Sequence, residues 1–379
     1  MRDTTHALDA HLAGWGLRSF TSDDAYFQWQ RETLSPDEIA TLHRQVEQKR
    51  RGASVDDVAF YDATAHPNIL PVLYSQRYDY YRAIGQRVVD RLGEARSILD
   101  VGCGVGILTT FYARHYPDKV FMGIDRSPLS VARAQARAQA LGLVNVRFNC
   151  LDLDHVAPSE SFDLIIATHA LLQAEQDPGI PSRNWNTFER ASDGLQHAEF
   201  ERRTGLGVKL DRLSSLLSGH GRMILFEKAR QLSRRIPLQR ALAARGFGLI
   251  EPPELIRYLL VEEVADDGPF YLLGRGASRQ FHWDEAPEPD EGPLFDRAKV
   301  KTGSHSSGEP LYENHWPSAQ AVWMQLHDKR LINETTKQET DGRQLHVEFG
   351  QAEEGLYLYC ANTLDQRQLV VVEPANRAV

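Results

Sequence analysis

A glycine-rich turn directly after an apolar run, SILDVGCGVGIL at residues 97–108, constrains this chain more than any other feature. Glycine has no Cβ, so such a turn lets the backbone reverse sharply and lets a ligand lie against bare main chain. Gly102, Gly104 and Gly106 are spaced G-x-G-x-G, whereas a dinucleotide site typically has G-x-G-x-x-G. A G-x-x-x-x-G-K-[ST] loop for a nucleoside triphosphate is also absent. The turn predicts a cofactor site of another kind.

The residues around this turn predict an α/β fold. From Ser97 onwards, short apolar runs alternate with helical patterns, and seven runs are candidate strands: 97–102, 120–125, 146–153, 162–168, 221–229, 246–250 and 270–275. One intervening helix has clear signals, with Ser127 as its N-cap, Pro128 at its first position and Gly142 at its end. Strands that alternate with helices form a parallel sheet covered on both faces.

The flanking regions predict three further segments. Residues 1–95 are expected to form a helical cap, residues 276–310 are an acidic and proline-rich linker, and residues 311–379 read as an antiparallel β domain. Within the last segment, Leu345, Val347 and Phe349 alternate with polar residues, so we expect their apolar face to be buried. The sheet domain between these flanks is expected to span residues 96–275.

The overall composition restricts the class of protein. The 379 residues carry a net charge of -9, which argues against a nucleic-acid partner because phosphate binding needs a positive field. No apolar run is long enough to cross a bilayer, so no membrane partner is expected. The three cysteines are far apart and suggest neither a disulfide framework nor a zinc ribbon. We expect a cytoplasmic protein and predict no metal site.

Carboxylates stand near the carboxyl ends of the first three strands, at the positions where a nucleoside would be bound. Asp100 precedes the glycines, Asp125 ends the second strand, where an acid commonly bonds a ribose diol, and Asp152 follows the third. With the turn LDVGCGVG, this pattern resembles class I methyltransferases that bind S-adenosylmethionine, with a Rossmann-like seven-stranded sheet. The resemblance covers roughly residues 96–275. It implies a cofactor site that contains Asp100, Gly102, Cys103, Gly104, Gly106, Asp125, Arg126, Leu151 and Asp152.

The segment before the sheet is rich in tyrosine, and we expect it to fold over the cofactor. Electron-rich rings stabilise a sulfonium cation, and an arginine there is able to pair with the cofactor carboxylate. Tyr78 and Arg77 are predicted to contact the cofactor, with Arg82 as the alternative arginine. Tyr61 and Tyr74 are predicted to contact the substrate.

Two residues near the ends of strands are candidates for catalysis. His169 follows the fourth strand and is either a general base or a hydrogen-bonded structural histidine. Glu227 ends the fifth strand and is predicted to orient a substrate nitrogen. The polar insert 173–217 resembles a substrate lid. Its glutamates are either lid surface or cation ligands: Glu175, Glu189, Glu199 and Glu201.

The layout of the whole chain is also similar to that of protein arginine methyltransferases, which have a helical cap, a Rossmann-like domain and a β-barrel with a His-Trp loop. His315 and Trp316 match that loop and are predicted to contact the substrate. Those enzymes have Ser-Glu after the fourth strand, where this chain has Ala167 and Thr168. A homodimer is a possible assembly.

We expect methyl transfer to a nitrogen or oxygen of a small molecule, with an amino acid or a guanidino compound as examples. A peptide side chain is the alternative acceptor. Two other classes stay open: an enzyme that cyclises or eliminates the aminobutyrate arm of S-adenosylmethionine, and a regulator that binds the cofactor without turnover. The DNA methyltransferase motif N-P-P-Y and a Pro-Cys pair are both absent from the sequence.

Overall fold

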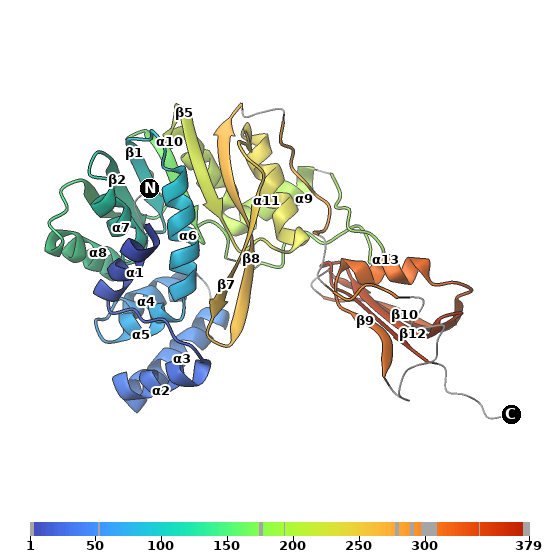
Figure 1. The fold of residues 1–379 in the computed structure, drawn as a ribbon. Helices are drawn as coiled ribbons and strands as arrows, with labels where there is room; N and C mark the ends of the chain where they lie inside the picture. The colour runs from blue at the N-terminus through green and yellow to red at the C-terminus, as the bar shows by residue number, and fades with distance from the viewer. Residues whose placement is uncertain are drawn as a thin grey trace. The chain divides into compact units, whose positions relative to one another are not determined.

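A computed structural model describes residues 4–51, 54–173, 177–192, 194–276, 280–288, 292–296, 309–340 and 342–373. The chain divides into two compact units (Figure 1). Unit 1 consists of Met1–Asp177, Glu201–Arg230 and Arg240–Trp283. Unit 2 consists of Pro178–Phe200, Gln231–Gln239 and Asp284–Val379. Residues 178–200 and 231–239 thus belong with the C-terminal segment, although the sequence places them between strands of the expected sheet domain.

The sheet of unit 1 has the predicted α/β character. Its strand order among the described residues is β3-β2-β1-β4-β5-β8-β6, and β7 pairs with β8 as an additional strand. The first five strands pair in parallel, and β8 pairs antiparallel with β5, β6 and β7. The strands are β1 (Ser97–Val101), β2 (Val120–Asp125), β3 (Val146–Cys150), β4 (Phe162–Thr168), β5 (Leu217–Phe226), β6 (Phe247–Leu249), β7 (Glu254–Leu260) and β8 (Glu263–Arg275).

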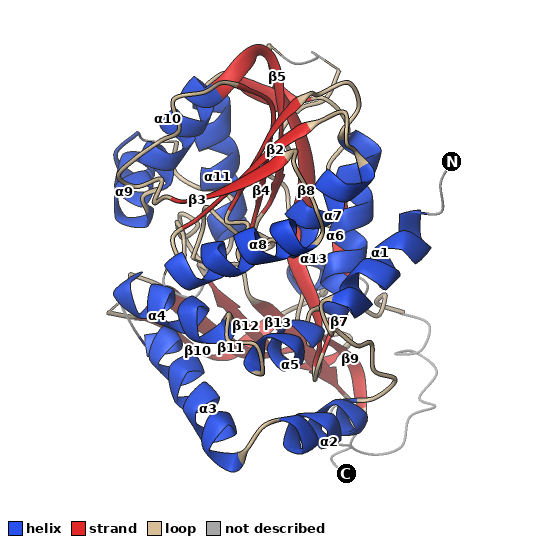
Figure 2. Cartoon of the chain, turned by 90° about the vertical axis from the view of Figure 1, so that its left-hand side faces the viewer, coloured by secondary structure: helices blue, strands red, loops and turns tan. Residues whose placement is uncertain are grey.

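Helices cover both faces of this sheet. Figure 2 shows α6, α7 and α8 on one side and α10 on the other. The helices with residues in unit 1 are α1 (Thr4–Gly14), α2 (Asp23–Thr33), α3 (Pro36–Arg51), α4 (Ser54–Thr64), α5 (Ile69–Ser75), α6 (Tyr78–Arg91), α7 (Ile107–His115), α8 (Pro128–Ala140), α10 (Leu206–Leu216) and parts of α9 (Gly194–Thr204) and α11 (Leu232–Ala244). The predicted start of α8 is confirmed, because the Ser127 hydroxyl accepts a hydrogen bond from the Ser130 N–H at 3.0 Å.

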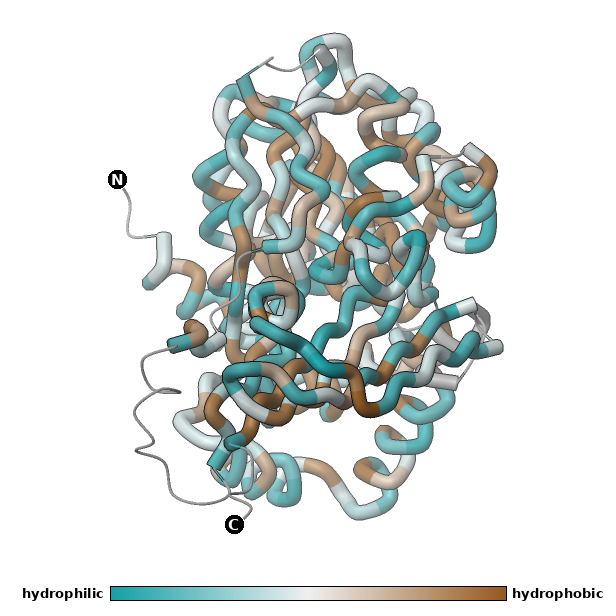
Figure 3. The backbone as a smooth tube through the Cα atoms, turned by 90° about the vertical axis from the view of Figure 1, so that its right-hand side faces the viewer, coloured by the Kyte–Doolittle hydropathy of each residue, from teal (hydrophilic) through white to brown (hydrophobic). Residues whose placement is uncertain are grey.

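The helical cap and the sheet share one hydrophobic core. Ile84 and Val88 of α6 are fully buried in the same cluster as Ile98 of β1 and Ile166 of β4. Figure 3 shows hydrophobic stretches along the strands inside unit 1 and hydrophilic stretches on its outer turns. Strands covered on both faces read as continuous apolar runs, which is why the sequence predicts their positions well.

Unit 2 is built on an open antiparallel sheet. The described strands have the order β10-β11-β12-β13-β9, with no closing pair between β10 and β9, so the barrel implied by the second resemblance is not found among them. The strands are β9 (Pro310–Asn314), β10 (Arg330–Gln338), β11 (Gln344–Ala352), β12 (Gly355–Asn362) and β13 (Arg367–Val372), and helix α13 spans Pro317–Gln325.

The alternating pattern in β11 correctly predicts a strand, but within this chain the opposite, polar face of the strand is the more buried one. Leu345 and Phe349 are each 38% exposed, whereas His346 is 1% exposed and Glu348 is 8% exposed. His346 pairs with Ala361 and Glu348 with Tyr359 of β12, and these two partners belong to the core of unit 2. The neighbouring strand therefore decides which face of β11 is buried.

Across the part of the chain that the structure describes, no helix has both the length and the apolar character needed to span a bilayer.

Candidate active site

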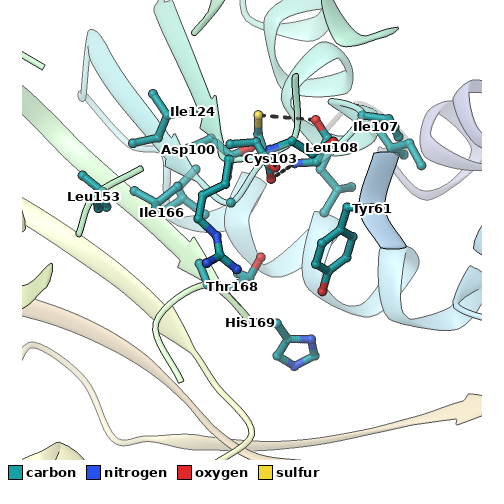
Figure 4. Close-up of a pocket in the computed structure, with 18 of the residues that line it drawn as sticks. Tyr61, Asp100, Cys103, Ile107, Leu108, Ile124, Leu153, Ile166, Thr168 and His169 are labelled. Atoms are coloured by element: carbon teal, nitrogen blue, oxygen red, sulfur yellow. Dashed lines mark hydrogen bonds between the residues drawn. The ribbon is translucent and has the colours of Figure 1, made fainter. Parts of the chain in front are cut away.

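A cavity of about 260 Å³ lies at the carboxyl ends of the parallel strands of unit 1 (Figure 4). Open α/β sheets bind ligands at this edge, where neighbouring connections diverge. The cavity is lined by twelve of the residues that the sequence singles out: Tyr61, Tyr74, Arg77, Asp100, Gly102, Cys103, Gly104, Asp125, Arg126, Leu151, Asp152 and His169. Five others are not among the lining residues: Tyr78, Gly106, Glu227, His315 and Trp316.

The three glycines of the turn are needed for different structural reasons. All three have positive φ angles, +69° at Gly102, +54° at Gly104 and +77° at Gly106. A Cβ on Gly102 would lie 2.8 Å from Ala170 Cβ, and one on Gly106 would lie 2.8 Å from Ala134 Cβ. A Cβ on Gly104 would meet no atom within 4 Å. The first and third glycines therefore serve close packing, and Gly104 presents bare backbone to the cavity.

Asp125 is held at the end of β2 by backbone donors. Its Oδ2 accepts a hydrogen bond from the Gly104 N–H at 2.9 Å, and its Oδ1 accepts one from the Ser127 N–H at 2.9 Å. Burial raises the pKa of this carboxyl, and the two backbone donors oppose that shift. Each carboxylate oxygen has more than one acceptor position, so both are still able to accept a hydroxyl of a ligand.

Asp100 lies beneath the turn with the Thr109 hydroxyl as its partner. The Thr109 Oγ1 donates to Oδ2 of Asp100 at 2.5 Å. Burial raises the pKa of Asp100 to about 7, and the hydrogen bond from Thr109 opposes this shift. The carboxyl group therefore changes its protonation state near neutral pH, inside the wall of the cavity.

His169 follows β4 in a left-handed conformation with a φ of +54°. Its Nδ1 lies 2.7 Å from Nη2 of Arg77, and its Nε2 lies 3.1 Å from Oδ2 of Asp267. A guanidinium only donates, so Nδ1 uses its lone pair as an acceptor and the proton of the neutral ring is on Nε2. Burial lowers the pKa of His169 to about 4. In this arrangement, the imidazole has no free lone pair with which to act as a general base.

Asp267 and Tyr258 complete this network, and sequence reasoning missed both. The Tyr258 hydroxyl donates to the Asp267 carboxylate, and the Arg77 guanidinium lies 4.3 Å from the centre of the Tyr80 ring. Burial by itself would raise the pKa of Asp267, but its contacts with His169 and Tyr258 bring it to about 2. Asp267 stands in the sequence VADDGP, which reads as an ordinary turn. Only the long β7–β8 hairpin brings it to His169.

Two lysines of the cavity lining were also not identified from the sequence. Lys209 of α10 and Lys228, which follows β5, lie in the wall together with Arg77 and Arg126. Lys209 Nζ lies 3.7 Å from Oδ2 of Asp154 and donates to the Leu171 carbonyl at 3.3 Å. The cavity thus combines anionic groups near the turn with several cationic groups around it.

Glu227 supports the loop after β4 and does not face the cavity. Its Oε1 accepts the N–H groups of Ala170 and Leu171, both at 2.9 Å, and its Oε2 accepts that of Leu172 at 3.2 Å. Burial raises the pKa of Glu227 to about 7, while these three donors oppose the shift. The expected contact with a substrate nitrogen is not supported by this position, because both oxygens are directed at the loop that carries His169.

The remaining predicted residues lie elsewhere. The Tyr78 hydroxyl donates to Asp9 at 3.3 Å, away from the cavity lining. His315 and Trp316 belong to unit 2, where the Trp316 residue is 52% exposed and precedes α13. Their contact with a substrate stays a prediction. Glu175, one of the lid glutamates, lies outside the described residues.

Comparisons with known proteins agree with the first resemblance. Residues 98–182 match a family model described as a methyltransferase domain. A malonyl-[acyl-carrier protein] O-methyltransferase from Acetivibrio thermocellus is 31% identical over 101 residues, which are 24% of this chain and 35% of the relative. A trans-aconitate 2-methyltransferase from Deinococcus radiodurans is 33% identical over 88 residues, 23% of this chain and 32% of the relative. The chain thus spans about a third of the length of these relatives.

Solved structures of similar proteins were also found. Magnesium protoporphyrin IX methyltransferase from Synechocystis, solved with bound SAM, aligns with a TM-score of 0.37 at 18% identity, covering 54% of this chain and 81% of that chain. The N-methyltransferase NodS from Bradyrhizobium japonicum aligns with a TM-score of 0.35 at 17% identity, covering 51% and 85%. The family match confirms the resemblance to class I methyltransferases that was based on the glycine turn and its carboxylates.

Proposed function

We propose, from the match of residues 98–182 to a methyltransferase domain, that the chain transfers the methyl group of S-adenosylmethionine to an oxygen of a small acid. Methyl transfer is a displacement at a sulfonium carbon, in which the cofactor supplies the reactivity. The protein's own residues contribute by holding the cofactor and by aiming the acceptor at the methyl carbon.

The pairing of Asp125 with the Gly104 backbone is the observation that carries the cofactor assignment. The carboxylate is fixed by two backbone donors at the end of β2, beside a glycine whose open side faces the cavity. Under the proposal, Asp125 accepts the ribose hydroxyls, and Leu151 and Asp152 lie against the adenine. Asp100, Gly102 and Cys103 lie at the methionine end, with Arg77 or a neighbouring cation near the cofactor's carboxylate.

The acceptor proposal rests on the state of His169. A hydroxyl or an ammonium acceptor must lose a proton, which requires a base with a free lone pair. The Nδ1 lone pair of His169 is occupied by Arg77, and burial lowers the pKa of the ring to about 4. A carboxylate is already ionised at neutral pH and needs no base. Arg77, Lys209 and Lys228 supply positive charge to the same cavity.

The names of two relatives agree with this choice, since they specify malonyl-[acyl-carrier protein] O-methylation and trans-aconitate methylation. Another relative is a tRNA (guanine-N(7)-)-methyltransferase, from Rubrobacter xylanophilus, so the family match by itself does not select the acceptor. A nitrogen acceptor is therefore the alternative that the experiment must distinguish from an oxygen acceptor.

Cofactor binding is tested by calorimetry with S-adenosylmethionine and S-adenosylhomocysteine. We expect saturable binding that Asp125→Ala weakens by about 1–3 kcal/mol, because a polar ligand group loses its partner in a buried site. Asp118→Ala is the control, since that side chain is 73% exposed. An affinity for S-adenosylmethionine equal to that of the wild type in Asp125→Ala would contradict the assignment of Asp125 to the ribose.

Turnover is tested by product analysis with a panel of di- and tricarboxylic acids, their amides, and amino and guanidino compounds. Formation of S-adenosylhomocysteine with the acids and not with their amides supports the proposal. Formation of S-adenosylhomocysteine only with amines would mean that the acceptor atom is a nitrogen and not an oxygen. Methylthioadenosine indicates attack on the aminobutyrate arm, and an unchanged cofactor throughout the panel indicates a binding protein without this activity.

A further inference from the structure

The buried face of the unit 2 sheet carries a polar cluster that has no part in the proposed function. Glu334 of β10 pairs with Glu348 of β11, and Thr336 pairs with His346 in the same register. Alternate residues of a strand share a face, so these side chains lie on one side of the sheet. Glu334, His346 and Glu348 each offer one ligand atom, and these atoms lie within 4.8 Å of one another.

His346 has a buried ring nitrogen without a hydrogen-bond partner. The residue is 1% exposed, and its Nε2 is among the buried atoms that have no partner. The other nitrogen, Nδ1, lies 2.8 Å from the Thr336 hydroxyl. When Nδ1–H donates to that hydroxyl, the lone pair is on Nε2, which lies 3.6 Å from Oε2 of Glu348. A buried lone pair beside a carboxylate is costly unless a cation or a proton lies between them.

Glu348 is oriented so that one oxygen remains available. Its Oε1 accepts hydrogen bonds from the Tyr357 hydroxyl at 2.5 Å and the Trp323 Nε1–H at 3.4 Å. Oε2 is the oxygen that faces His346. Outer contacts of this kind, on both the histidine and the carboxylate, are typical of ligands that hold a metal ion.

The rest of the surroundings agree with a cation at this position. The ring of Trp185 stacks on His346 with a centroid distance of 3.6 Å and fixes the plane of the imidazole. Glu334 is exposed, so one side of the cluster is open to water. The nearby Lys329 ammonium donates to the Trp323 carbonyl at 2.8 Å and lies 4.1 Å from the Trp323 ring centre, so it is already bound by other groups.

We propose that unit 2 binds a divalent transition-metal ion of the Zn²⁺ type through His346 Nε2, Glu348 Oε2 and the Glu334 carboxylate. The imidazole selects this class of ion over Mg²⁺ and Ca²⁺, which prefer oxygen ligands alone. A water molecule on the open side completes the coordination. Because two ligands come from β11 and one from β10, the ion fastens the edge strand to the sheet. The inference does not depend on methyl transfer.

The test uses the full chain after removal of metals with a chelator. Zn²⁺ is titrated by calorimetry, and Co²⁺ is titrated by visible absorption. We expect one saturable site, at least 10-fold weaker binding in Glu334→Gln, and a rise in the Tm of the wild-type chain on addition of Zn²⁺ that this variant lacks. Glu353→Gln is the matched control, since Glu353 is an exposed glutamate beside the same sheet and outside the cluster.

Glu334→Gln decides the outcome because its side chain is exposed and the change is conservative, so the variant is expected to fold. His346→Asn and Glu348→Gln are second variants, each first compared with the metal-free wild type by circular dichroism. Wild-type affinity in Glu334→Gln, or no saturable binding to the wild-type chain, overturns the proposal. Weaker Zn²⁺ binding by Glu334→Gln, together with unchanged binding by Glu353→Gln, supports the proposal whatever the result of the cofactor experiments.

Discussion

The two sheets of this protein bury polar groups in different places. In unit 1, the parallel strands are apolar through most of their length, and polar residues such as Asp125 and Thr168 stand at their carboxyl ends. In unit 2, His346 and Glu348 lie within the buried face of an antiparallel sheet, and Arg367 is buried at the start of β13. The parallel sheet thus collects its polar groups at one edge around a cavity, whereas the antiparallel sheet must satisfy them within its own core.

This difference has a physical origin in how strands are connected. Parallel strands all end at the same edge, so residues far apart in the sequence meet there and face open space. An antiparallel meander brings neighbours together along the whole strand, so a polar side chain on the inner face needs a partner from the next strand. We therefore expect substitutions of the polar residues around the cavity of unit 1 to affect ligand binding as well as stability, and substitutions of buried polar residues in unit 2 to affect stability without a loss of cofactor affinity.

Arg367→Met is expected to have the largest effect. The buried guanidinium donates to Gln320 Oε1 at 2.7 Å, to the Thr187 carbonyl at 3.0 Å and to the Gln366 carbonyl at 2.9 Å. Its removal leaves these acceptors unpaired, so urea unfolding of unit 2 should lose about 4 kcal/mol of stability. Arg330→Met, on the exposed edge strand, is the control. A loss of S-adenosylmethionine affinity in place of stability would break the contrast between the two units.

Asp100→Asn tests the parallel sheet through its pH dependence. Burial raises the pKa of Asp100 from its ordinary value of 3.8 to about 7. A raised pKa gives stability that is present below about pH 4 and is lost as the pH rises to 7. The stability of the wild type relative to the Asn variant should fall by roughly 3 kcal/mol between pH 4 and pH 7.5. A difference that stays constant over this range would contradict the assigned pKa.

A pair of glycine variants gives the smallest effect and the sharpest comparison. Gly104 and Gly142 have φ angles of +54° and +65°, and a Cβ added at either position would meet no atom within 4 Å. Alanine at either position should cost about 1 kcal/mol of stability through the left-handed backbone. Only Gly104→Ala places a methyl group in the cavity, so only this variant should bind S-adenosylmethionine at least fivefold more weakly. Equal binding by both variants would show that Gly104 does not approach the cofactor.

The sequence predicted much of unit 1, because its signals are local. An apolar run followed by glycines identifies a strand and a turn, and Ser127 with Pro128 identifies the start of α8. The sequence also placed Asp125 at the end of its strand, where the structure finds it in the cavity wall. The strand β7 was missed, because Glu254 and Arg257 interrupt its apolar character.

The pairing of distant segments was decided only by the tertiary structure. The sequence alone determined the strand and glycine turn at residues 97–106, the start of α8 and the carboxylate at the end of β2, because backbone conformation at apolar runs, caps and glycines follows from local residue types. It did not determine that Asp267 would meet His169, that Glu227 would support a loop, or that the inner face of β11 would carry His346 and Glu348. Those outcomes depend on which strand lies beside which, and side-chain contacts across a sheet are fixed by register between segments that lie apart in the chain.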